Sequence, residues 1–70
     1  MTVKSLKEAR REQILKSAEK VFSEKGFQNS TISDVAKETG VSDTTIYEYF
    51  SSKEDLLFSI PRDGIELSKQ

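Results

Sequence analysis

The sequence contains no cysteine, histidine or tryptophan, and it has one proline among its 70 residues. The missing cysteines exclude a disulfide framework and a thiolate metal site. The missing histidines remove the commonest general base and the commonest metal ligand, so no cofactor is expected. No apolar run approaches the ~20 residues of a membrane span, and the N-terminus lacks the apolar core of a signal peptide. We therefore expect one small domain in the cytoplasm.

The first helix is predicted over residues 8–25, after a polar, mobile arm over residues 1–8. Apolar residues recur at helical spacing along this helix and would form one stripe, made of Ile14, Leu15, Ala18, Val21 and Phe22. Gly26 is predicted to end the helix in the left-handed conformation, with Phe27 packed back against Phe22.

Two short helices follow, predicted over residues 32–39 and 43–49. Thr31 is a good N-cap for the earlier one, and Asp34 makes a partial capping box because Glu or Gln is preferred at that position. Gly40 should end this helix, and Ser42 should cap the next. Ile46 and Phe50 lie one turn apart and are expected to face the core.

The fourth helix is predicted over residues 52–60, with Ser51 and Glu54 as a full capping box. Its apolar face consists of Leu56, Leu57 and Ile60. Pro61 should end it, because proline disfavours helical geometry in the residue before it. Residues 61–70 are interpreted as a loop or as the truncated start of a further domain. Since no segment alternates as a strand does, the predicted fold class is all-α.

The most informative spacing is that of Ala36, Gly40 and Ile46. A helix-turn-helix needs a small residue where its two helices cross, a residue tolerating positive φ in the turn, and a branched apolar anchor on the second helix. These three residues meet those needs. The expected fold is a three-helix, homeodomain-like helix-turn-helix domain plus the start of a fourth helix. A plain helical hairpin without a ligand remains the alternative from spacing alone.

Residues ~10–58 resemble the N-terminal region of tetracycline-repressor (TetR) type regulators. The similarity opens with Arg11-x-x-Ile14-Leu15-x-x-Ala18-x-x-x-Phe22-x-x-x-Gly26-Phe27. It continues through Thr31-Ile32-x-x-Val35-Ala36-x-x-x-Gly40-Val41-Ser42. It closes with Thr45-Ile46-Tyr47-x-Tyr49-Phe50-x-Ser52-Lys53-Glu54-x-Leu56-Leu57, its most diagnostic part.

This resemblance implies a DNA-binding domain, over residues 1–60, of a bacterial transcriptional regulator. Members of the family are mostly repressors that bind palindromic operators as homodimers. A larger helical C-terminal domain dimerises and binds a small-molecule inducer. The chain stops before such a domain, so we expect an excised fragment or a natural remnant that is monomeric by itself. Its expected location is the bacterial cytoplasm, with the nucleoid.

By the same resemblance, the third helix reads base edges through its first residues, Ser42, Asp43, Thr44 and Thr45. Threonine hydroxyls can hydrogen-bond to bases or phosphates, with simple helix-start chemistry as the alternative. Asp43 could accept a hydrogen bond from cytosine N4. The favoured interpretation of Asp43 is a cap-supporting charge turned away from phosphates.

Two tyrosines and a lysine are predicted to contact phosphates beside this helix. The Tyr47 hydroxyl is expected to reach a phosphate while its ring packs below, with a half-buried core aromatic as the alternative. Tyr49 is expected near the DNA backbone. Lys53 lies in the first turn of the fourth helix, where a cation is unfavourable for the helix dipole. Such a conflict is expected where a phosphate binds, and a solvated lysine is the alternative.

Further phosphate contacts are predicted at the start of the second helix, from Thr31 and Ser33. The N-terminal segment adds four candidates that could reach phosphates or the minor groove, with a merely soluble tail as an equal alternative for the first two: Lys4, Lys7, Arg10 and Arg11. The net charge is only −1, but residues 1–30 hold seven Lys/Arg against four Glu, whereas residues 31–50 hold one Lys against four Asp/Glu. This distribution favours phosphate contacts from the flanks of the reading helix.

Three other functions are compatible with a small helical domain. An enzyme is disfavoured because the carboxylates are scattered over predicted solvated faces and four short helices enclose little volume. A protein-interaction module is the stronger rival, since small acidic helical domains often bind partner helices. A different helix-turn-helix family is disfavoured by the segment from Tyr47 to Lys53.

Overall fold

The computed structural model describes residues 5–60, which contain helices and no strand. The helices are α1 (Leu6–Lys25), α2 (Ile32–Thr39), α3 (Asp43–Tyr49) and α4 (Lys53–Ser59). The all-α prediction is confirmed. Lys4 and the loop predicted over residues 61–70 lie outside the described residues. None of the four helices is long and apolar enough to cross a membrane.

α1 begins two residues earlier than predicted. The hydroxyl of Ser5 accepts a hydrogen bond from the Glu8 backbone N–H at 3.1 Å, and the Glu8 carboxylate accepts one from the Ser5 N–H at 3.2 Å. This reciprocal capping box supplies partners for two backbone donors that would otherwise lack them. The arm predicted over residues 1–8 is therefore wrong for residues 6–8, because the apolar stripe starts later than the helix does.

α1 ends at Lys25, as predicted, but Gly26 does not take the left-handed helical conformation. Its φ of +85° is positive, whereas its ψ of 147° is extended. The chain leaves the helix through a hydrogen-bonded turn, in which the Asn29 N–H donates to the Gly26 carbonyl oxygen at 3.2 Å. The Phe27 ring still packs edge-on against Phe22, with 5.2 Å between the ring centroids, which confirms that part of the prediction.

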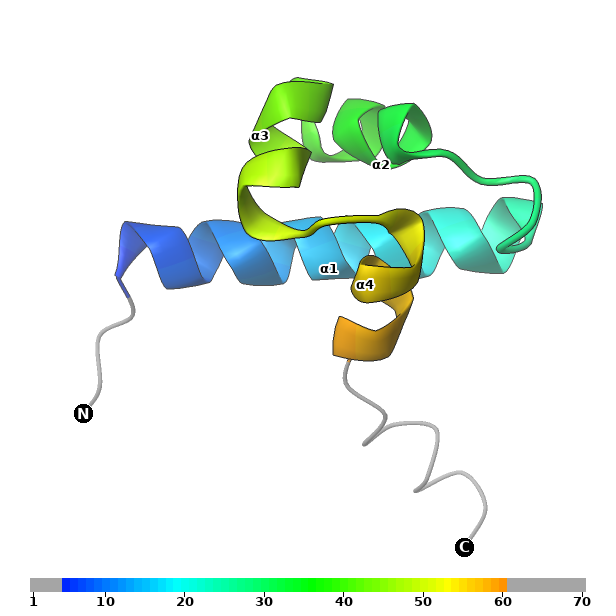
Figure 1. The fold of residues 1–70 in the computed structure, drawn as a ribbon, viewed down its shortest axis with the longest axis horizontal. Helices are drawn as coiled ribbons and strands as arrows, with labels where there is room; N and C mark the ends of the chain where they lie inside the picture. Colours follow the sequence, from blue (N-terminus) through cyan, green and yellow to red (C-terminus); the bar gives the residue numbers. More distant parts are fainter. Residues whose placement is uncertain (1–4, 61–70) are drawn as a thin grey trace, which may run out of the picture.

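The core lies along one side of α1. In Figure 1, α2 and α3 lie on one side of this long helix and α4 lies on another. α1 packs against both α2 and α4, and α2 packs against α3. The buried apolar side chains come from all four helices and their ends: Ile14, Leu15, Ala18, Val21, Ile32, Val35, Ala36, Ile46, Phe50, Leu56 and Ile60. The predicted stripe of α1 is thus confirmed, with Phe22 only half-buried.

Two ion pairs tie α1 to α2 on the outside of this core. Lys20 lies 3.0 Å from Glu38, and Lys25 lies 2.9 Å from Asp34. The hydrogen bond from Lys25 lowers the pKa of the Asp34 carboxyl, and the hydrogen bond to Glu38 raises the pKa of Lys20. Both pairs are exposed to solvent, so each contributes little to stability by itself.

α4 starts one residue later than its predicted capping box. Ser52, not Ser51, is the N-cap, and its hydroxyl accepts from the Asp55 N–H at 3.1 Å. The Asp55 carboxylate in turn accepts from the Ser51 N–H at 2.9 Å. The predicted pairing of Ser51 with Glu54 is therefore wrong. The helix ends before Ile60, whose ψ of 129° is extended, as expected for a residue that precedes proline.

Candidate nucleic-acid interface

α2 and α3 are joined by a tight turn of the kind that a helix-turn-helix requires. Gly40 takes the left-handed conformation, with φ +87° and ψ 29°. The N–H of Val41 then donates to the Ala36 carbonyl oxygen at 3.0 Å, which closes the end of α2. Ala36 is buried at this end of the helix. The conformation favours glycine at position 40, as predicted from the sequence.

Both helices of the motif begin at the predicted caps. Thr31 and Asp34 form a complete reciprocal box, with both hydrogen bonds at 3.0 Å, although the sequence indicated only a partial one. The shorter side chain of Asp34 thus completes the box. Ser42 caps α3 by accepting from the Thr45 N–H at 3.2 Å. Ile46 and Phe50 anchor α3 in the core.

The side of α3 that turns away from the core is polar and exposed. Its exposed residues are Ser42, Asp43, Thr44, Tyr47 and Glu48. Thr45 is half-buried, and its hydroxyl lies 3.2 Å from that of Ser42. This side therefore presents hydroxyl, carboxylate and phenol groups on a helix that is held at one end by a tight turn and along its inner side by the core.

Two of the predicted site residues contact each other across the motif. The Ser33 hydroxyl in the first turn of α2 donates to the Asp43 carboxylate at the start of α3, at 2.5 Å. The bond joins the N-terminal ends of the two helices, so it restrains their relative position. Asp43 is exposed and lies in the first turn of α3, directly after the predicted cap Ser42.

The two tyrosines lie in different surroundings. Tyr47 is 54% exposed and lies outside the core, so the alternative of a half-buried core aromatic is wrong. Tyr49 is half-buried and packs against the core cluster. The phenol of Tyr47 is thus the more accessible of the two for an outside partner.

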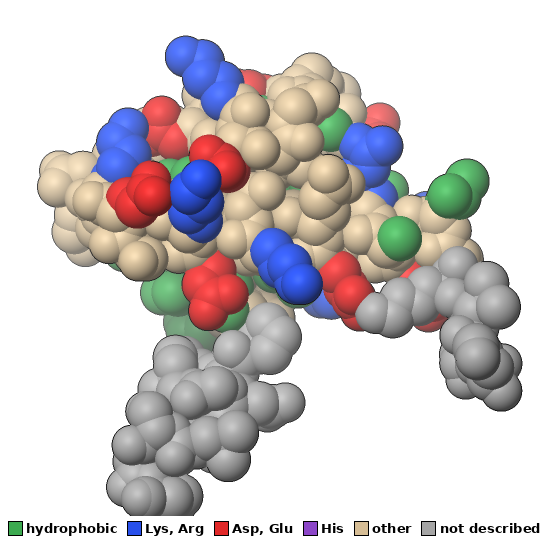
Figure 2. Space-filling model, turned by 180° about the vertical axis from the view of Figure 1, so that it is seen from behind, with side chains coloured by type: hydrophobic (Ala, Val, Ile, Leu, Met, Phe, Trp, Pro, Cys, Tyr) green, Lys and Arg blue, Asp and Glu red, His purple; other side chains and the backbone are tan. Residues whose placement is uncertain are grey.

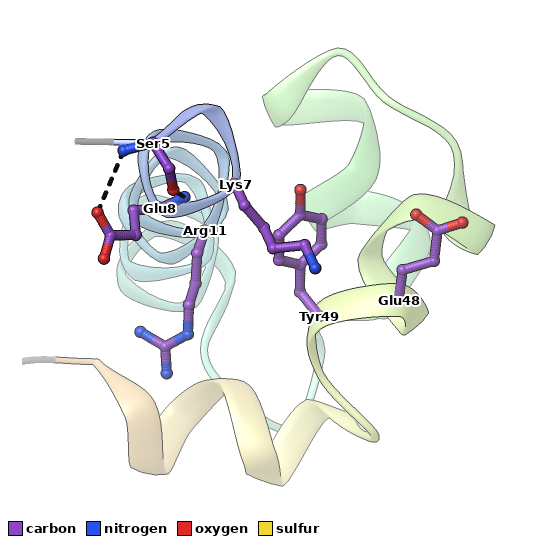
Figure 3. Close-up of a pocket in the computed structure, with 6 residues that line it drawn as sticks. All are labelled: Ser5, Lys7, Glu8, Arg11, Glu48 and Tyr49. Carbon is purple, nitrogen blue, oxygen red and sulfur yellow. Dashed lines mark hydrogen bonds between the residues drawn. The ribbon is translucent and has the colours of Figure 1, made fainter.

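A groove separates the first turns of α1 from the end of α3. Figure 3 shows Lys7 extending across it towards Tyr49, and Glu48 on the far side from α1. Its lining residues are Ser5, Lys7, Glu8, Arg11, Glu48 and Tyr49. Two cations and two carboxylates share this groove, so its charge is nearly balanced.

The two predicted arginines belong to α1 and not to an arm. Arg10 is exposed and has no ion pair within residues 5–60. The Arg11 guanidinium lies 5.2 Å from the centroid of the Phe50 ring, so this cation is already engaged with an aromatic face. Seen from behind, the surface formed by residues 5–60 mixes basic and acidic side chains without a continuous basic patch (Figure 2).

Lys53 has internal partners that the sequence did not indicate. Its ammonium donates to the carbonyl oxygens of Phe27 at 2.8 Å and Ser30 at 3.1 Å. It also lies 4.4 Å from the centroid of the Phe27 ring. The alternative of a merely solvated lysine is therefore wrong. The conflict with the helix dipole is offset by two backbone carbonyls of the loop between α1 and α2.

Ser30 is the residue that the sequence analysis missed. It is 2% exposed, and its hydroxyl donates to the Gly26 carbonyl oxygen at 2.7 Å. A serine two residues before a helix is common in connections, so no local signal distinguished it. Its burial shows that the loop over residues 27–30 is packed and hydrogen-bonded.

Comparison with known proteins shows which family has this arrangement of helices. The family model for bacterial regulatory proteins of the tetR family matches residues 14–60. The chain belongs to the tetR family. The protein is therefore not expected to be an enzyme, since this family consists of transcriptional regulators. The match includes all of the helix-turn-helix and α4.

Individual relatives are similar over the same region. The HTH-type transcriptional regulator HbdR of Aromatoleum sp. (strain CIB) is 40% identical over 70 residues, covering 100% of this chain and 31% of that protein. The fatty acid metabolism regulator protein of Bacillus subtilis (strain 168) is 48% identical over 48 residues, covering 69% of this chain and 25% of that protein. A crystal structure of an HlyIIR mutant superposes with a TM-score of 0.75 at 36% identity, over 80% of this chain and 32% of that one. The chain thus spans about a third or less of these relatives.

Proposed function

We propose that residues 5–60 bind double-stranded DNA by placing the first turns of α3 in the major groove. The observation that carries this proposal is the exposed polar side of α3, which a left-handed Gly40 turn and two core anchors hold in place. A helix presented in this way fits the width of the major groove. Membership of the tetR family supports the same conclusion.

The phosphate contacts are proposed to come from groups around α3. Tyr47 offers an exposed phenol, and Arg10 and Lys7 offer cations at the first turns of α1. Ser33 and Thr31 lie at the N-terminal end of α2, where backbone N–H groups favour an anion. Ser42, Thr44 and Thr45 are the proposed base-reading or phosphate-binding hydroxyls, and Tyr49 and Arg11 flank them.

The whole protein is proposed to be a homodimeric repressor in the bacterial cytoplasm. A palindromic operator would place two copies of α3 about 34 Å apart, one helical turn of DNA. A small-molecule inducer would bind to a part of the protein beyond this region and release the DNA. A single copy of residues 5–60 should bind weakly, because dimerisation supplies the second half-site.

Titration with duplex DNA at low salt tests the proposal. We expect amide shifts in NMR spectra at residues 42–49, and an affinity that falls steeply as salt is added. A matched control is the same titration of a Thr44→Pro, Tyr47→Ala chain, checked for folding by circular dichroism. Shifts confined to other surfaces, or binding that does not depend on salt, would instead favour a protein-interaction module.

A further inference from the structure

A carboxylate lies on the side of α3 that is proposed to face DNA. Asp43 is the first residue of this helix and is exposed. Tyr47 follows four residues later, so the two side chains share one side of the helix, with Thr44 beside them. No Lys or Arg of residues 5–60 forms an ion pair with Asp43. Within that range the carboxylate therefore has no counter-ion at the place where the helix would approach DNA.

Ser33 holds one of the two oxygens of this carboxylate. Its hydroxyl donates to Asp43 Oδ2 at 2.5 Å, whereas Asp43 Oδ1 has no hydrogen bond to a residue of the range 5–60. Both residues are exposed, so the bond satisfies no buried group and its main effect is on the direction of the carboxylate. One oxygen is thus fixed against α2, while no other residue of the described range occupies the second.

The chemistry of the major groove limits what the second oxygen can bind. An ionised carboxylate only accepts hydrogen bonds, and phosphates and the guanine edge also offer only acceptors there. The donors in this groove are the amino groups of adenine and cytosine. In an A·T pair the amino group lies between two acceptors, adenine N7 and thymine O4, which repel a carboxylate. In a C·G pair one neighbour of the amino group is the C5–H of cytosine, so cytosine is the better match.

We propose that Asp43 reads the N4 amino group of a cytosine in the operator, with Ser33 as its positioning residue. This inference rests on the proposed function, since it assigns a base to the same helix. By fixing the carboxylate before DNA binds, the Ser33 hydroxyl lowers the conformational entropy that is lost on binding. The single donor of this hydroxyl is committed to Asp43, so a phosphate contact at Ser33 would come from its backbone N–H.

Selection of duplexes from a random pool tests which base is read. We expect the parent chain to enrich one position of the half-site in cytosine, and exchange of this C·G pair for A·T should lower its affinity about 10-fold. Asp43→Asn should change the preference at that position to adenine, because an amide pairs with adenine N6 and N7. Glu48→Gln is the matched control. It removes the same charge from an exposed residue on another side of α3 and should keep the preference of the parent.

Two serine variants test the positioning role. Ser33→Ala should reduce the preference for C·G over A·T about threefold, because the carboxylate must then be ordered when DNA binds. Ser33→Thr keeps a hydroxyl and should restore the preference. Thermal melts of both variants should match the parent, since Ser33 is exposed. An equal loss of affinity for the two duplexes would show a merely structural role and overturn the positioning by Ser33.

A modified base tests which atom is read. N4-methylcytosine still pairs with guanine, but its methyl group replaces the amino hydrogen that faces the major groove. At the enriched position it should lower the affinity of the parent about 10-fold, as the change to A·T does. An unreduced affinity would overturn the proposal, and so would a preference that Asp43→Asn leaves unchanged. A parent chain that binds duplex DNA but enriches no cytosine overturns this inference alone, whereas one that binds no duplex overturns the proposed function as well.

Discussion

The cations at the two ends of α1 differ in what they contact. At the closed end, defined here by Lys20, Lys25 and Lys53, each cation has an internal acceptor at 2.8 to 3.1 Å. At the open end, defined by Lys7 and Arg10, neither cation has an ion pair or hydrogen bond to a residue of the described range 5–60.

The difference explains how a chain of net charge −1 can still present cations to DNA. The closed-end cations neutralise Glu38 and Asp34 and saturate loop carbonyls, so they hold α1, α2 and α4 together. The open-end cations have no such partner within residues 5–60, and Lys7 lines the groove beside the end of α3. The total charge of the chain is therefore a poor guide to its surface, because three of these five cations are already engaged.

The largest expected effect is a loss of unfolding free energy when a side chain is removed from the core that joins the two ends of α1. Ile46→Ala removes a side chain of 0% exposure from α3 and should cost about 2–5 kcal/mol of unfolding free energy. Urea denaturation measures this loss. Phe58→Ala is the control, because Phe58 is 73% exposed and should change stability little. Equal losses in the two variants would contradict the burial of Ile46 in the core.

A smaller effect should appear on the exposed side of α3. Tyr47→Phe removes an exposed phenol hydroxyl and should weaken DNA binding by about 1 kcal/mol, roughly fivefold. Its melting temperature should stay that of the parent, because the ring of Tyr47 lies outside the core. Anisotropy titration at fixed salt and a thermal melt together check this. Binding like the parent's would remove Tyr47 from the interface.

Two lysine variants should sharpen the contrast between the ends. Lys7→Ala should lower DNA affinity and leave the melting temperature unchanged. Lys25→Ala should lower the melting temperature slightly, through loss of its bond to Asp34, and leave the salt slope of DNA binding unchanged. The reverse pattern in this pair would show that the two ends are assigned the wrong way round.

The smallest expected effect is a dependence of the melting temperature on pH in the acidic range. Lys25 lowers the pKa of Asp34, so this carboxylate stabilises the fold above its unfolded-state pKa of about 3.9. That contribution is lost as the pH falls through the lower folded-state pKa. Melting temperatures between pH 5 and pH 2 should therefore fall less in Asp34→Asn than in the parent. Parallel curves would show that the ion pair does not contribute.

Local signals predicted the middle of the molecule well. Thr31, Gly40 and Ser42 each act on the neighbouring turn, so the bounds of α2 and α3 could be read from the sequence. The N-cap of α4 was harder to predict, because Ser51 and Ser52 each have an acidic residue three positions later. The structure uses Ser52 with Asp55, a choice that neighbouring residues alone did not decide.

The partners of Lys53 could not be predicted in the same way. They lie 26 and 23 residues away in the sequence, on backbone atoms of a loop. Every residue supplies a similar backbone carbonyl, so no side-chain pattern marks the contact. The bond between Ser33 and Asp43 was missed for a related reason, since it depends on how the turn at Gly40 orients the two helices.

The Ser33–Asp43 hydrogen bond has a consequence for redesign and for divergence among related sequences. Because the hydroxyl and the carboxylate satisfy each other, replacing either one leaves the other without its partner at the edge of the reading helix. Substitutions at positions 33 and 43 should therefore be tolerated best in matched pairs. A library that aims at a new operator preference would need to vary both positions together, although only one of them belongs to α3.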